Sequence, residues 1–211
     1  MIFLDFGMPV FAGMTSKLSF SVPVKFKIVN LFFNMAAPKP PLPVKLIIAA
    51  LYSDENLLNA ARDRLIQQFG PVDFTSPPFP FELTDYYVPE MGAPIKRLFY
   101  GFAPLISPGE LARIKLTTNA CEDELSLNGK RHVNLDPGYL DPDKLVLASA
   151  KYNGQKIYLA EGIWADLTLH YEKGHFTAYP WSFADFRSGA YEKIFLRLRE
   201  IYKAQLRRGG S

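Results

Sequence analysis

Apolar runs and helical apolar stripes alternate along the chain from residue 44 onward. The run Val44–Tyr52 predicts a buried strand, because it is almost wholly apolar and has the length of a strand. Ser53 and Asp54 are expected to begin a helix, and Gly70-Pro71 to end it. The apolar face of this helix would consist of Leu58, Ala61, Leu65 and Phe69. Strand, tight turn and helix together form an α/β unit.

A second unit of the same kind follows a proline-rich connection. Residues 72–74 predict a short strand, whereas residues 77–81 cannot form an internal strand because proline lacks the ladder donor. Residues 82–92 are expected to form a long polar and aromatic loop, and residues 96–105 the next strand. Ser107-Pro108-Gly109-Glu110 has the pattern of a capping box. The helix after it would bury Leu111, Ile114, Thr118, Cys121 and Leu125.

The last third of the chain predicts strands followed by one long helix. Extended structure is expected over residues 133–140, 155–159, 163–171 and 176–179. Residues 145–150 fit a strand or a short helix, and we favour the strand. An aromatic loop over 180–187 would precede an amphipathic helix over 188–206. These elements predict an α+β fold with a mixed β-sheet, two flanking helices, β-hairpins and a long C-terminal helix. The first six elements match a ferredoxin-like split βαβ order.

Length and pattern together predict one domain over residues 41–208. Residues 1–34 show neither helical nor alternating periodicity, and no apolar run there reaches the ~20 residues of a membrane span. We expect residues 1–40 to be a poorly ordered extension with a proline-rich linker, and Met35 to be the true start. A signal peptide is not expected, because no basic region precedes the apolar stretch.

Charge and cysteine content narrow the function classes. The formal net charge is +3, but three lysines and one aspartate fall within residues 1–34, so the remainder carries only +1. A nearly neutral domain has no broad field to attract polyanions, so we do not expect a nucleic-acid partner. Without an apolar run of membrane-spanning length, we expect no membrane partner either. The single cysteine, Cys121, excludes an internal disulfide and a Cys-pair zinc site, and fits a reduced, cytoplasmic chain. Its place on an apolar stripe favours a buried, inert thiol over a nucleophile.

The segment 130–140 concentrates polar chemistry at the edge of the predicted core. It carries Lys130, Arg131, His132, Asn134 and Asp136 around an expected Pro-Gly turn. The loop 82–92 offers an acid and two phenols as possible ligands, although the acid could equally cap a turn and the phenols cover the core. If the pairs Lys96-Arg97 and Lys130-Arg131 lie on neighbouring strands, four cations could clamp an anion. Ordinary charge pairs at strand edges are the favoured alternative. The candidate ligand-binding residues are Asp54, Thr84, Asp85, Tyr86, Tyr87, Glu90, Lys96, Arg97, Lys130, Arg131, Asn134, Asp136 and Tyr139.

Metal, cofactor and nucleophile motifs are weak. The histidines His132, His170 and His175 lack helical metal-ligand spacing, and we predict no metal site. A Mg²⁺ site on Asp136, Asp141 and Asp143 is chemically reasonable, but turn and cap chemistry explains these residues better. The serines Ser53, Ser107 and Ser188 are better explained as helix caps than as nucleophiles. No cofactor is assigned, and an enzymatic activity stays an open question.

Several stretches resemble one protein family. They are residues 44–54, 78–87, 90–92, 134–140 and 144–148, and the resemblance extends over roughly residues 41–203. The family is the bacterial one known as domain of unknown function 4416, which implies no established activity. Relatives are sometimes labelled GTP-binding, but the chain has no G-x-x-x-x-G-K-[ST] loop and no G-x-G-x-x-G motif.

Two functions remain as hypotheses. The first is a binding or enzymatic domain for an anionic small molecule, such as a nucleotide or a phosphorylated metabolite. The second is a non-catalytic interaction module that uses aromatic loops. Convergence of Asp85, Arg97, Arg131, Asn134 and Asp136 on one concave pocket would favour the first hypothesis, and their scatter over a convex face would favour the second.

Overall fold

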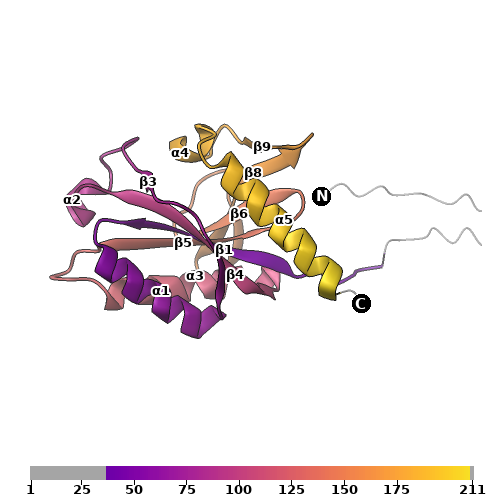
Figure 1. Cartoon of the computed structure of the whole chain (residues 1–211), viewed down its shortest axis with the longest axis horizontal. Coiled ribbons are helices and arrows are strands. Elements are labelled where there is room, and N and C mark those ends of the chain that lie inside the picture. The colour runs from indigo at the N-terminus through magenta and orange to yellow at the C-terminus, as the bar shows by residue number, and fades with distance from the viewer. Residues whose placement is uncertain (1–36, 210–211) are drawn as a thin grey trace, which may run out of the picture. The chain divides into compact units, whose positions relative to one another are not determined.

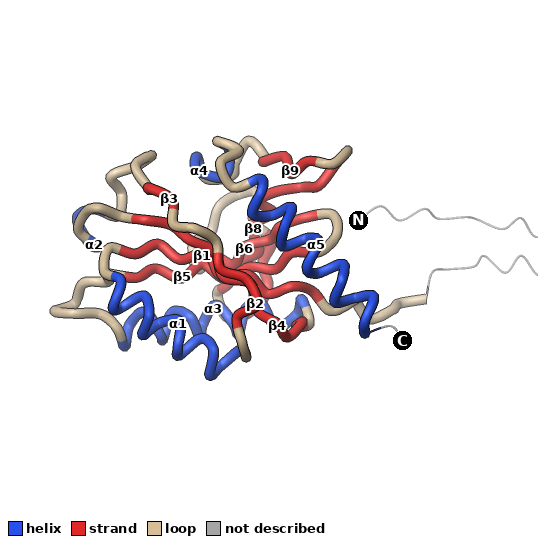
Figure 2. Tube along the Cα trace, in the orientation of Figure 1, coloured by secondary structure: helices blue, strands red, loops and turns tan. Residues whose placement is uncertain are grey.

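A nine-stranded β-sheet runs through the described part of the molecule, with helices on both of its faces (Figures 1 and 2). The structure is a computed structural model that describes residues 37–209. The predictions for residues 1–34 and for a start at Met35 therefore fall outside the described residues. The compact unit that contains the sheet begins at Pro40.

The strands and helices follow the predicted order closely. The strands are β1 Val44–Tyr52, β2 Val72–Thr75, β3 Phe79–Pro80, β4 Lys96–Ile106, β5 Val133–Leu140, β6 Lys144–Ser149, β7 Ile157–Ala160, β8 Ile163–Glu172 and β9 His175–Ala178. The helices are α1 Glu55–Phe69, α2 Val88–Met91, α3 Leu111–Glu124, α4 Ala184–Arg187 and α5 Glu192–Gly209. The α+β prediction is confirmed. The short helices α2 and α4 lie in segments that the sequence predicted to be loops.

The order and direction of the strands show how the helical connections cross the sheet. The strands lie in the order β2-β4-β1-β5-β6-β8-β7, with β3 added beside β4 and β9 beside β8. Each hydrogen-bonded pair among these strands is antiparallel. Strands joined through a helix therefore run parallel with one strand between them, as β1 and β2 do around β4. This is the split βαβ order that the first six elements predicted.

Strand β1 is the centre of the core because both of its faces are covered. All nine residues of β1 are buried. Leu46, Ile48 and Ala50 pack towards α1 and α3, whereas Ile47 and Ala49 pack towards α5. Figure 1 shows α1 and α3 together on one face of the sheet and α5 across the other. A strand buried on both faces reads as the continuous apolar run seen in the sequence.

The predicted caps at Asp54, Gly70 and Ser107 are confirmed. Ser53 and Ser188 do not begin helices: Ser53 Oγ donates to the Met91 carbonyl, and Ser188 follows α4 and lies four residues before α5. Asp54 accepts a hydrogen bond from the backbone N–H of Leu57 over 2.9 Å at the start of α1. Gly70 ends α1 with φ 87°, a conformation that glycine adopts without a Cβ penalty. Ser107 and Glu110 form the capping box, in which the Ser107 N–H donates to Glu110 Oε2 over 2.9 Å.

Asp136-Pro137-Gly138 is not the turn that the sequence predicted. These residues lie within β5, which pairs with β1 along its whole length. Gly138 is required there because a Cβ would lie 2.5 Å from the Val146 carbonyl oxygen on β6. The turn prediction holds for the next such motif, where Asp141 Oδ1 accepts from the N–H groups of Asp143 and Lys144 at 2.8 and 2.9 Å.

Strands β5 and β6 separate soon after the turn that joins them. Their pairing covers only Gly138 to Leu140 of β5. Pro137 lies at the point of separation and has no N–H to donate to a neighbouring strand. The preceding residues 133–136 keep β1 on one side, and no strand of the described range 37–209 pairs with them on the other. The gap left on that side is the position of the candidate site.

Candidate functional site

Side chains of α3 satisfy the strand edge that β6 leaves unpaired. The Leu135 N–H donates to Glu122 Oε1 over 2.8 Å, and the Leu135 carbonyl accepts from Lys115 Nζ over 2.8 Å. Thr118 Oγ1 lies 3.4 Å from the same carbonyl. Buried backbone groups need such partners, and here a helix supplies them in place of a strand.

Arg131 joins this edge to the loop region 82–92. Its guanidinium holds Glu90 through two hydrogen bonds, Nε to Oε1 at 2.6 Å and Nη2 to Oε2 at 2.8 Å. Its Nη1 also donates to Glu122 Oε2 over 2.7 Å. The two carboxyls respond differently: the hydrogen bonds from Arg131 lower the pKa of Glu90, whereas burial raises the pKa of Glu122.

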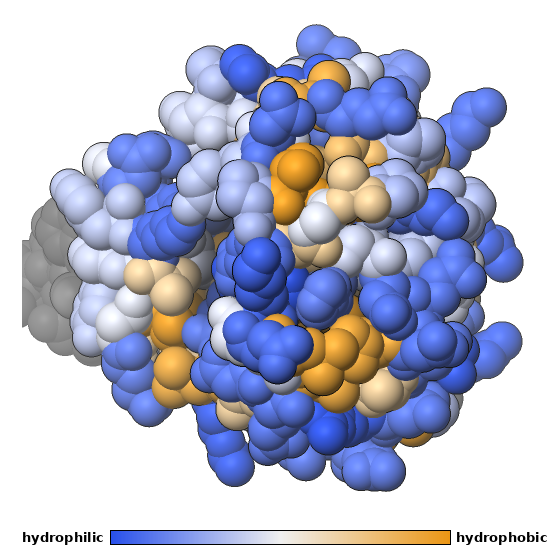
Figure 3. Space-filling view, turned by 90° about the vertical axis from the view of Figure 1, so that its left-hand side faces the viewer, coloured by the Kyte–Doolittle hydropathy of each residue, from blue (hydrophilic) through white to orange (hydrophobic). Residues whose placement is uncertain are grey.

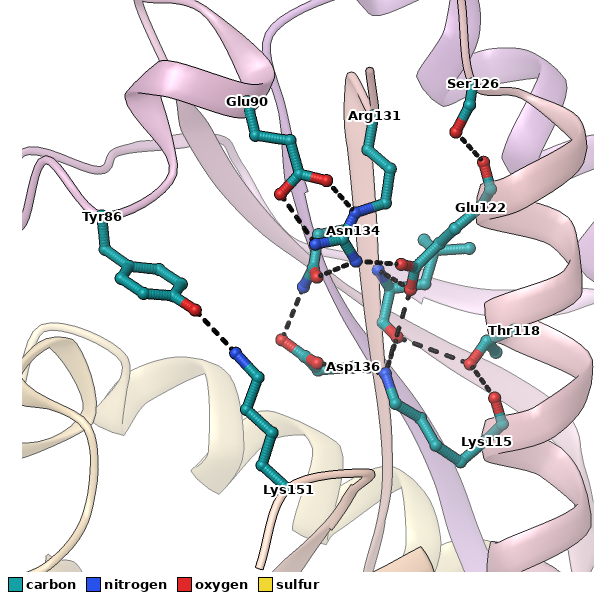
Figure 4. Close-up of polar contacts among 11 residues, drawn as sticks. Tyr86, Glu90, Lys115, Thr118, Glu122, Ser126, Arg131, Asn134, Asp136 and Lys151 are labelled. Carbon is teal, nitrogen blue, oxygen red and sulfur yellow. Dashed lines mark hydrogen bonds and ion pairs between the residues drawn. The ribbon is translucent and has the colours of Figure 1, made fainter. Parts of the chain in front are cut away.

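The network continues along β5 through alternating donors and acceptors (Figure 4). Arg131 Nη1 donates to Asn134 Oδ1 over 3.3 Å, and Asn134 Nδ2 donates to Asp136 Oδ2 over 2.8 Å. Lys115 Nζ lies 3.3 Å from the other oxygen of Asp136. Asn134 and Asp136 lie two residues apart on a strand and therefore share a face of the sheet.

A cleft of about 810 Å³ opens beside this network. Its walls come from the loop 82–87, from α3 and β5, from the segment 149–156 after β6, and from α4. The lining mixes charged side chains with apolar ones that include Phe81, Leu83, Leu147 and Phe183. On the face of the molecule in Figure 3, hydrophobic residues gather in separate patches, each bordered by hydrophilic residues. Small-molecule sites have this size and this mixture of residues.

Arg97 and Asp185 form a buried ion pair in one wall of the cleft. Arg97 Nε lies 2.8 Å from Asp185 Oδ2, and the two side chains are 5% and 4% exposed. The Cζ atom of Arg97 lies 5.1 Å from the centre of the Phe81 ring and 5.5 Å from that of Phe186. Tyr87 also lines the cleft, and burial, together with the charge of Asp136, raises its pKa to about 12, so its phenol stays protonated at neutral pH.

Lys151 and Tyr86 meet across the mouth of the cleft. Lys151 Nζ donates to the Tyr86 hydroxyl over 2.7 Å, and both side chains are exposed. Figure 4 shows this pair facing the network of Arg131, Asn134 and Asp136 from the other side. Each other cation that lines the cleft lies within 4.0 Å of a carboxylate, but Lys151 has no carboxylate partner within the described residues.

Seven of the predicted candidates line the cleft. They are Thr84, Tyr86, Tyr87, Arg97, Arg131, Asn134 and Asp136. Glu90 does not line it but holds Arg131. Asp85 lines a separate hollow of about 510 Å³ together with Lys96. Of the five residues whose convergence on one pocket would favour a small-molecule site, four therefore line the cleft.

The remaining candidates lie elsewhere. Asp54 caps α1, Lys96 pairs with Glu55 at 3.2 Å, and Lys130 is exposed in the turn between α3 and β5. Tyr139 packs beside a core cluster that includes Val146. The condition for a clamp of four cations is not met, because β4 and β5 lie on opposite sides of β1. Lys96, Arg97 and Arg131 instead form ion pairs with carboxylates, in line with the favoured alternative.

Sequence reasoning missed the α3 contribution and the residues after β6. Lys115, Asn119, Glu122 and Asp123 line the cleft from α3, and Lys151, Tyr152 and Lys156 line it from the 149–156 segment. The first three α3 residues recur at helical spacing beside the apolar stripe, and this polar stripe is the signal that could have found them. No local pattern marks the 149–156 segment.

Residues 37–209 contain no cluster of three or more His, Cys, Asp or Glu side chains placed to hold a metal ion. The helices described here include none that is both long enough and apolar enough to cross a membrane. Cys121 is buried as predicted, and burial raises the pKa of its thiol.

Comparison with known proteins places the chain in a family. A family model described as "Domain of unknown function (DUF4416)" matches residues 42–202. The chain belongs to the DUF4416 family. The match includes each element that lines the cleft, so the site lies within the part of the chain that the family model covers. No curated protein and no solved structure matches the chain.

Proposed function

We propose that the cleft binds a small polar molecule that carries an anionic group. The observation that carries this proposal is convergence: Arg97, Arg131, Asn134 and Asp136 come from two strands and the turn before one of them, and line one concave cleft. Buried charged groups gathered at a cleft are typical of binding sites. Nucleotides and phosphorylated metabolites belong to this ligand class.

Lys151 supports the anionic character of the ligand. It is the lining cation without a carboxylate partner among the described residues, and its ammonium group is accessible. A ligand anion near Lys151 would gain a charge-assisted hydrogen bond and could take a second one from the Tyr86 hydroxyl. Neither group would need to break an ion pair to do so.

A thermal-shift screen tests the proposal. The panel holds nucleotides, sugar phosphates and carboxylic acids, each with and without Mg²⁺. We expect at least one anionic class to raise Tm, and Lys151→Ala to weaken its binding roughly tenfold. Lys173→Ala is the matched control, since Lys173 lies in the turn between β8 and β9 with a side chain 86% exposed. Absence of any shift across the panel would contradict the proposal.

A non-catalytic interaction module is the second candidate. The observation that favours it is the exposure of large aromatic side chains around the cleft and the strands beside it. Tyr86, Tyr152, Tyr158, Trp181 and Phe183 are each at least 43% exposed. Such residues are common anchors of protein interfaces. If no compound in the thermal-shift panel raises Tm, the interaction module becomes the better-supported candidate.

A further inference from the structure

The guanidinium of Arg97 lacks a hydrogen-bond acceptor among the described residues. The contact of its Nε with Asp185 has the distance of an ion pair, but its geometry does not make a hydrogen bond. Among the nitrogens of Arg97, Nε is the one that is fully buried without a hydrogen-bond partner in the described residues. The residue is 4% exposed, and the surface that it retains lines the cleft.

A buried guanidinium without hydrogen-bond acceptors destabilises the fold unless another group supplies them. A guanidinium carries five N–H donors, and buried polar groups in folded proteins are almost always hydrogen-bonded. Leaving a charged donor unpaired in a buried position is unfavourable in general. A group that enters the cleft can supply the missing acceptors, because the cleft is where Arg97 meets open space.

We propose that Arg97 binds a carboxylate of the ligand, a step that rests on the proposed function of the cleft. A planar carboxylate matches the donor fork of arginine with two parallel hydrogen bonds. The ligand class is therefore a carboxylic acid. Its acid group would lie against Arg97 and its body against the apolar lining beside Arg97.

The charge of the cleft favours a carboxylate over a phosphate. Within residues 37–209, five cations line the cleft, namely Arg97, Lys115, Arg131, Lys151 and Lys156. In the same range, six carboxylates line it or pair with those cations, namely Glu90, Glu122, Asp123, Asp136, Asp166 and Asp185. A phosphate monoester brings about −1.5 to −2 charges into this excess of negative charge, whereas a carboxylate brings one. Asp185, 2.8 Å from Arg97 Nε, adds to the repulsion of a dianion.

The surroundings of Arg97 favour an apolar body behind the carboxylate. The rings of Phe81 and Phe186 contact the guanidinium, at 5.1 and 5.5 Å from its Cζ atom. Leu83, Leu147 and Phe183 line the same cleft. An aromatic or branched aliphatic group attached to the acid would bury apolar surface against these residues.

Matched probes test the inference on the full-length protein. Phenylacetate, its neutral amide phenylacetamide, and phenyl phosphate are titrated to their solubility limits. Binding is followed by isothermal calorimetry and by the side-chain Nε–H signal of Arg97 in NMR spectra. We expect phenylacetate to shift the Arg97 signal, and phenylacetamide and phenyl phosphate to bind roughly tenfold or more weakly.

A double variant locates the effect. Arg97→Gln with Asp185→Asn removes both charges, so neither remains buried alone. It should fold and lose the preference for acid over amide. The control removes the exposed pair Arg62 and Asp63, whose side chains are 41% and 64% exposed, and should keep the preference. If the double variant does not fold, the acid-to-amide comparison on the unaltered protein still decides.

The outcomes separate this inference from the proposed function. If nucleotides or phenyl phosphate bind through Lys151 while the Arg97 signal stays still, the carboxylate inference is overturned and the proposed function stands. Equal binding of phenylacetate and phenylacetamide also overturns the inference. If neither these probes nor the wider panel binds, both proposals fail together.

Discussion

Glu122 on α3 accepts a hydrogen bond from the backbone N–H of Leu135 on β5, over 2.8 Å. Where β5 and β6 have separated, a helix side chain thus supplies the hydrogen-bond acceptor that a neighbouring strand would otherwise provide. The same carboxylate holds Arg131 at 2.7 Å and lies 3.9 Å from Lys115. This 3%-exposed residue therefore supports the cleft wall and is one of the two carboxylates that pair with Arg131 and with Lys115.

Glu122→Ala should destabilise the fold by about 3 kcal/mol, because it leaves the buried Leu135 N–H without its acceptor and removes one of the two carboxylate partners of Arg131 and of Lys115. The measurement is the free energy of unfolding from urea denaturation. Glu124→Ala on the same helix is the control: its side chain is 66% exposed in a surface pair with Arg64, so a change within about 0.5 kcal/mol is expected. Equal effects of the two variants would show that the network does not support the wall.

Much of the fold could be predicted from the sequence because local signals agreed with the tertiary structure. The continuous apolar run of β1 indicated a strand covered on both faces, and the caps at Asp54 and Ser107 placed two helix starts. The motif at Pro137 was misleading, because Asp-Pro-Gly is common in turns. Only the close approach of β6 shows why Gly138 lies within a strand.

The candidate site was less predictable, because its partners are far apart in sequence. Arg131 was identified, but its acceptors Glu90 and Glu122 lie 41 and 9 residues away. A meeting of the two cationic pairs was possible only if β4 and β5 were neighbours, and their separation by β1 is a property of sheet order. Sheet order depends on long-range pairing, and no local pattern near Arg97 or Arg131 encodes it.

Glu90 should make stability depend on acid pH. Hydrogen bonds from Arg131 lower its pKa in the folded state, so the unfolded chain takes up its proton first as pH falls. Its contribution is therefore present above the ordinary glutamate pKa of 4.5 and is lost as pH falls through the lower folded value. Unfolding free energies of the wild type and Glu90→Gln, measured from pH 7 to about 3, should differ at the upper end and converge at the lower. A difference that grows on acidification would be the opposite of the expected sign.

Cys121 should behave as a buried thiol. It is 7% exposed in the core between α1 and α3, and burial raises its pKa, so little thiolate is available at neutral pH. Ellman's reagent should react with the native protein much more slowly than with glutathione, and at once after unfolding in guanidinium chloride. Fast stoichiometric reaction of the native protein would instead mark Cys121 as accessible and reactive.

Gly138→Ala should destabilise the fold by roughly 1–3 kcal/mol, because the added methyl group forces two strands apart. Its Cβ would lie 2.5 Å from the Val146 carbonyl oxygen and 2.6 Å from Leu147 Cδ2. Val146 and Leu147 belong to the only part of β6 that pairs with β5 in the described sheet. The strain therefore falls where the two strands are still joined, next to the cleft. Gly154→Ala is the control, since a Cβ there meets nothing within 4 Å. Thermal unfolding of both variants decides: a normal Tm for Gly138→Ala would mean that β5 and β6 tolerate a wider separation than the close contact implies.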